Sequence, residues 1–102
     1  MKTVEFLDAV KVAYGLTSDY QLAKKLAVTH SSISHYRSGR NFMDDSLAVK
    51  VAYLLDVDPL SVLAFAHIER EERRGEETLV SFWKDIAKRT GEVDILTKLS
   101  AA

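Results

Sequence analysis

The chain has 102 residues and no cysteine, and its 14 Lys and Arg residues against 15 Asp and Glu residues give a formal net charge of −1. This length predicts one domain with a single hydrophobic core. Without cysteine there is no disulfide framework, thiolate metal site or cysteine nucleophile. Glu5 and Asp8 interrupt the apolar run that a signal peptide needs, and no uncharged apolar run approaches the ~18 residues of a membrane span. We therefore expect a soluble, cytoplasmic protein.

Apolar residues recur at helical spacing, and the single Pro and four Gly residues fall where helices are expected to begin or end. These patterns predict an all-α fold. A first helix is expected from about Thr3 to Tyr14, followed by Gly15. Phe6, Val10 and Ala13 share one face of this helix, which we expect to be buried.

Two short helices are expected next, separated by a three-residue turn. Ser18 is a suitable N-cap for a helix over residues 19–26. Thr29 is a suitable N-cap for a helix over residues 30–38, which Gly39 ends.

A loop over residues 41–45 should follow, with either Phe42 or Met43 buried beneath it. Asp44 and its neighbours place caps and negative charge at the start of a fourth helix over residues 45–55. The residues of this helix expected to face the core are Leu47, Val51, Leu54 and Leu55.

Asp58 and Pro59 predict the start of a fifth helix, with Asp58 as N-cap and Pro59 in the first turn. Glu69 and Arg73, near its end, are spaced to form an ion pair. The stripe expected to be buried on this helix is Leu60, Leu63, Ala64 and Ile68.

A sixth amphipathic helix is expected over residues 77–89, after a break at Gly75. Two interpretations of its apolar stripe remain open. The helix packs back on its own domain, or it forms a homodimer interface, which we favour because aromatic residues are common anchors there. We therefore divide the chain into residues 1–74 and a C-terminal element, residues 75–102. The candidate interface residues are Leu79, Phe82, Trp83 and Ile86.

Positive charge is concentrated in residues 21–40, which contain Lys24, Lys25, Arg37 and Arg40 but no acidic residue. On a near-neutral protein, such a local basic surface indicates a polyanionic partner. The same stretch has small residues where two crossing helices need them, Ala23 and Ala27. Large apolar residues suited to the space between the helices are Leu22, Val28, Ile33 and Tyr36.

Residues 18–55 resemble the helix-turn-helix of the Cro and lambda-repressor class of phage and bacterial regulators. The matching residues are Gln21-Leu22-Ala23, Leu26, Ala27-Val28-Thr29, Ile33-Ser34, Tyr36, Gly39, Leu47, Val51-Ala52 and Leu55-Asp56-Val57. The resemblance implies a lambda-repressor-like domain of five helices over about residues 2–70, with the sixth helix as an addition. Two positions depart from the class pattern: Ala27 stands where Gly is usual in the turn, and Asp19 stands where a phosphate-contacting Gln is common.

The resemblance also implies a docking geometry, in which the helix after Thr29 lies in the major groove of double-stranded DNA. The base-reading candidates are His30, Ser31 and His35. The residues expected at or near the sugar-phosphate backbone are Gln21, Lys24, Lys25, Thr29, Ser32, Ser34, Arg37, Ser38, Arg40 and Asn41.

We expect a transcriptional regulator that binds a pseudo-palindromic operator as a homodimer. The expected kind is a repressor of phage or prophage type. We expect no catalytic residue, metal, cofactor, membrane or small-molecule substrate. His30 and His35 are five residues apart, which does not suit metal binding on one helical face. The alternative is a protein-interaction module, such as an antitoxin or an adaptor of the same fold.

Overall fold

The computed structural model describes residues 1–91, and the part of the C-terminal element that comprises residues 92–102 lies outside this range. The described residues contain six α-helices and no β-strand. The helices are α1 (Thr3–Ala13), α2 (Asp19–Leu26), α3 (His30–Arg37), α4 (Asp45–Leu55), α5 (Pro59–Arg74) and α6 (Glu77–Arg89). The all-α prediction is confirmed, and each predicted helix is present with ends within about one residue of those expected. No helix within residues 1–91 is both long enough and apolar enough to cross a membrane.

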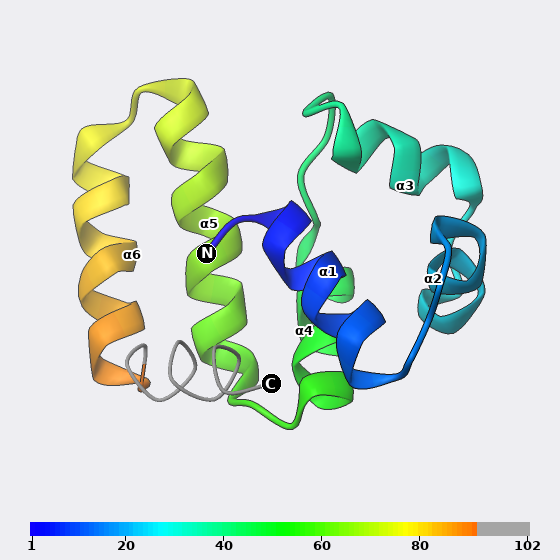
Figure 1. The fold of residues 1–102 in the computed structure, drawn as a ribbon. Helices are drawn as coiled ribbons and strands as arrows, with labels where there is room; N and C mark the ends of the chain where they lie inside the picture. The colour runs from blue at the N-terminus through cyan, green and yellow to red at the C-terminus, as the bar shows by residue number, and fades with distance from the viewer. Residues whose placement is uncertain (92–102) are drawn as a thin grey trace.

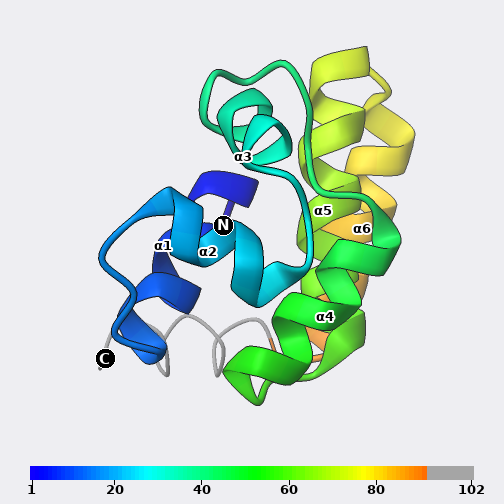
Figure 2. The ribbon, with the colours of Figure 1, turned by 90° about the vertical axis from the view of Figure 1, so that its right-hand side faces the viewer.

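The order of the helices across the molecule differs from their order along the chain. Figure 1 shows α6 and α5 side by side at one end, α1 and α4 in the middle, and α2 and α3 at the other end. Figure 2, turned by 90°, views the molecule from the end that α2 and α3 form, with α5 and α6 farther from the viewer. The pair formed by α2 and α3 therefore lies at the end remote from α6. One side of α2 and one side of α3 are exposed to solvent.

A single apolar cluster joins α1, α2, α3, α4 and α5. Phe6, Leu22 and Ile33 are fully buried in it, as expected, and Val28 and Tyr36 are half-buried against it. Met43 is the fully buried residue of the loop before α4. The prediction that Ala13 is buried was wrong, because it is the last residue of α1 and lies beyond this cluster, exposed to solvent.

α5 contacts α4 on one side and α6 on the other, so its buried surface is wider than one stripe. Val62 and Phe65 are buried in the apolar cluster, whereas Ser61 is buried where its Oγ donates to the backbone oxygen of Thr90, directly after α6, at 2.6 Å. Leu60 was predicted to be buried but is 43% exposed, because neither neighbouring helix covers its flank.

The charged residues at the end of α5 are tied to other parts of the fold. The carboxylate of Glu69 accepts hydrogen bonds from both the backbone N–H and the hydroxyl of Thr3. Arg73 instead donates from Nη1 to the backbone oxygen of Gly39 at 2.6 Å. The predicted pair between Glu69 and Arg73 is therefore absent, because each side chain finds a partner from a distant segment.

Candidate nucleic-acid interface

The tight connection between α2 and α3 depends on backbone geometry at Ala27. This residue has φ 56° and ψ 42°, the left-handed conformation that the departure from Gly leads us to expect. In this conformation the N–H of Ala27 donates to the backbone oxygen of Lys24 at 3.2 Å. The N–H of Val28 donates to the backbone oxygen of Ala23 at 3.0 Å. These bonds satisfy carbonyl groups that the end of α2 would otherwise leave unpaired.

Both helices of the pair begin at the caps that the sequence predicts. The hydroxyl of Ser18 accepts from the N–H of Gln21 at 3.1 Å, and that of Thr29 accepts from the N–H of Ser32 at 3.0 Å. Capping by a hydroxyl typically contributes about 1 kcal/mol to a helix. The cap at Thr29 therefore fixes where α3 starts and which of its residues face outward.

α3 presents a polar flank to solvent. His30, Ser31 and Ser34 are exposed, His35 is half-buried, and the fully buried Ile33 anchors the opposite side. The exposed groups are short or planar hydrogen-bonding side chains, and α3 contains no carboxylate. This flank is therefore free of the negative charge that a phosphate backbone would repel.

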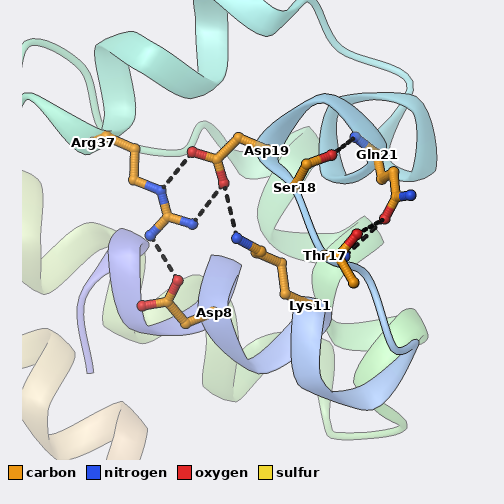
Figure 3. Close-up of polar contacts among 7 residues, drawn as sticks. All are labelled: Asp8, Lys11, Thr17, Ser18, Asp19, Gln21 and Arg37. Atoms are coloured by element: carbon orange, nitrogen blue, oxygen red, sulfur yellow. Dashed lines mark hydrogen bonds and ion pairs between the residues drawn. The ribbon is translucent and has the colours of Figure 1, made fainter.

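Arg37, at the end of α3, is held by carboxylates from two other helices (Figure 3). Its Nη1 lies 2.7 Å from Oδ1 of Asp8, and its Nη2 lies 3.0 Å from Oδ1 of Asp19. Lys11 adds a longer contact to Asp19 at 3.4 Å. The hydrogen bond from Arg37 holds the pKa of Asp19 below its ordinary value, although partial burial opposes this effect.

This network changes the role expected of Arg37. The Arg37 side chain is 24% exposed, and its guanidinium is already paired with two carboxylates and links α3 to α1 and α2. Arg37 is thus better placed to fix the orientation of α3 than to contact phosphate. Asp19 was singled out from the sequence as unable to donate to phosphate. The part played by Asp8 could not be foreseen, since it depends on how α1 packs against α3.

Three of the four basic residues remain available. Lys24, Lys25 and Arg40 are exposed, and none forms an ion pair with any residue between 1 and 91. The ammonium group of Lys24 lies 4.9 Å from the ring centre of Tyr20, and that of Lys25 lies 4.2 Å from the ring centre of Tyr14. These tyrosines restrict the lysines without neutralising them. Tyr20, 60% exposed, is a member of this surface that sequence reasoning missed.

The remaining predicted backbone contacts lie around the same pair of helices. The amide oxygen of Gln21 accepts from the N–H of Thr17 at 2.7 Å, which leaves its NH₂ group free to donate elsewhere (Figure 3). The hydroxyls of Thr29 and Ser32 lie 2.9 Å apart. Ser38 and Asn41 are exposed beyond the end of α3.

The four candidate interface residues of α6 divide into two pairs. Trp83 stacks on His67 of α5, with ring centres 4.2 Å apart, and Ile86 is half-buried. Leu79 and Phe82 are 42% and 53% exposed. α6 thus packs on its own chain through one face, and an adjacent apolar ridge remains at the surface.

A scan against models of protein families found no match for this chain, and searches of curated proteins and of solved structures found no similar protein. In the part of the chain that the structure describes, no group of three or more His, Asp or Glu residues is arranged to hold a metal ion.

Proposed function

We propose that this protein is a sequence-specific double-stranded DNA-binding regulator of the Cro and lambda-repressor type, and that α1 to α5 form a domain of that fold. The observation that carries the proposal is the polar, solvent-facing flank of α3 together with the neighbouring cations that have no carboxylate partner within residues 1–91. Lys24, Lys25 and Arg40 would supply affinity through phosphates, and His30 and Ser31 would read base edges in the major groove.

The proposed mechanism is occupancy of an operator, with no chemical step. The N-terminal end of α3 would enter the major groove, because its outward residues are short enough to allow close approach. Its flank contains no Arg, Asn or Gln suited to bidentate base recognition. We therefore expect modest discrimination from each half-site, with DNA shape and a second protomer contributing the remainder.

The second protomer is assigned to the exposed ridge of α6, built around Leu79 and Phe82. The helix carries Glu77 near its start and Lys88 and Arg89 near its end. Antiparallel pairing of two copies of α6 would place the acidic start of one beside the basic end of the other. A homodimer of this kind would match a pseudo-palindromic operator.

The same ridge favours one alternative, since an exposed apolar ridge would equally suit a different protein as partner. In that case the chain would be an antitoxin-like or adaptor module.

Selection of bound duplexes from a random pool by the purified chain tests the proposal. Native mass measurement of the wild type and of Phe82→Ser should accompany it. We expect recovery of a two-fold symmetric sequence, a dimeric wild type and a more dissociated variant. Failure of the chain alone to enrich any sequence would contradict the proposal and favour the interaction module.

A further inference from the structure

A groove of about 510 Å³ lies between the segment that follows α3 and the last turns of α5. Four of its eight lining residues are arginines, namely Arg40, Arg70, Arg73 and Arg74, and its one carboxylate is that of Glu71. We call this feature the arginine groove. In Figure 1, the end of α5 and the connection after α3 both lie at the top of the view.

The cations of the arginine groove exceed the anions that neutralise them. Arg70 pairs with Asp45 at 2.6 Å, and Arg74 lies 3.3 Å from the carboxylate of Glu71. Arg40 and Arg73 have no carboxylate partner anywhere in residues 1–91. Two positive charges in one concave site are therefore left for a ligand to neutralise.

The guanidinium of Arg73 is held in place before any ligand arrives. It donates to the backbone oxygen of Gly39 at 2.6 Å and lies 5.1 Å from the ring centre of Phe42. Because a guanidinium has five N–H donors, most of them remain free after this single bond. A planar group with fixed donors suits the oxygens of phosphate better than a mobile lysine does.

We propose that the arginine groove binds phosphate, and that the phosphate belongs to the backbone of the duplex whose major groove α3 enters. This inference rests on the proposed function and extends its contact surface to α5. The favoured source is DNA because Arg40 belongs both to the groove and to the cations beside α3, so the two surfaces are continuous. The groove would then hold the backbone that flanks the site read by α3.

The first experiment compares Arg73→Gln and Arg73→Ala with the wild type in duplex-binding titrations at several salt concentrations. One duplex is the selected operator with flanking base pairs, and the other is the same sequence trimmed to the base pairs that α3 reads. The matched control is Lys84→Gln, which removes an exposed cation from α6 and lies outside the ridge of Leu79 and Phe82. Circular dichroism establishes that each variant is folded.

On the long duplex, each groove variant should reduce the magnitude of the slope of log K against log salt by about 0.9 for each phosphate that the complex no longer neutralises. On the trimmed duplex, the groove variants, the control and the wild type should bind alike. If the wild type binds the long duplex and both groove variants keep its slope, the inference is overturned while the proposed function stands.

A second experiment on the wild type separates DNA from a free phosphate ligand and does not depend on the variants folding. Pyrophosphate is titrated into the labelled protein while the amide signals of Gly39 and Phe42 are followed by NMR. Saturable shifts in a protein that binds no duplex would show the groove to be a site for a free phosphate-bearing ligand, so the duplex part of the inference would fail. The absence of both duplex binding and shifts would overturn the inference together with the proposed function.

Discussion

Replacing Ala27 by glycine should stabilise the protein. Ala27 has φ 56° and is exposed, so its methyl group forms little packing that the change would remove. The left-handed conformation costs an L-residue about 1–2 kcal/mol, and glycine avoids this cost. Glycine also makes the unfolded chain more flexible, which offsets about 0.4–1 kcal/mol. The net expectation is an increase of about 0.5–1 kcal/mol in the free energy of unfolding.

For a domain of this size, that increase corresponds to a rise in Tm of about 2–8 °C. Thermal unfolding followed by circular dichroism measures it, and urea unfolding should give a higher midpoint with an unchanged m-value. Ala13→Gly is the matched control, because Ala13 is also exposed but ends the right-handed helix α1, where glycine is unfavourable. A fall in Tm for Ala27→Gly similar to that of the control would show that the left-handed conformation of Ala27 carries no strain.

Three further predictions concern the surface formed by α2 and α3. Arg37→Gln should lower the free energy of unfolding by about 1–2 kcal/mol while leaving the salt slope of DNA binding unchanged, whereas Arg40→Gln should reduce that slope and leave stability unchanged. Equal slopes for the two variants would count against these roles. The pKa of Asp19 is lowered by its hydrogen bond with Arg37, so its ionisation stabilises the folded state above the unfolded pKa of about 3.9. Acidification below about pH 4 should therefore cost the wild type more stability than Asp19→Asn, and parallel pH profiles in urea unfolding would exclude this effect. His30→Ala should reduce discrimination among operator variants by about 1–3 kcal/mol in competition binding, and an equal loss for every sequence would instead indicate a phosphate contact.

Local signals in the sequence were enough to predict the helices. Ser18 and Thr29 cap α2 and α3 as expected, because a cap depends only on residues within one turn. Asp58 and Pro59 locate the start of α5 for the same reason. The outward flank of α3 also follows from helical periodicity once Ile33 is assigned to the core.

Contacts between segments far apart in the chain could not be predicted from the sequence. The link from Arg37 to Asp8 requires the packing of α1 against α3, which spacing along the chain does not reveal. Leu60 is exposed because neither α4 nor α6 covers its flank of α5. Helical spacing predicts one buried stripe and does not show which flanks two neighbouring helices cover. Arg73 contacts Gly39, which lies 34 positions earlier in the chain. The arginine groove could therefore not be predicted from the charged residues at the end of α5 alone.

Equilibrium binding of the selected duplex as a function of salt is the sharpest test of DNA binding by the surface around α3. Three cations without carboxylate partners beside α3 in each of two protomers give about six phosphate contacts, and hence a slope of log K against log salt of about −5. We expect a slope at least this steep, with tighter binding to the selected sequence than to a scrambled duplex at every salt concentration. A flat salt response, or equal affinity for both duplexes, would contradict the proposed function.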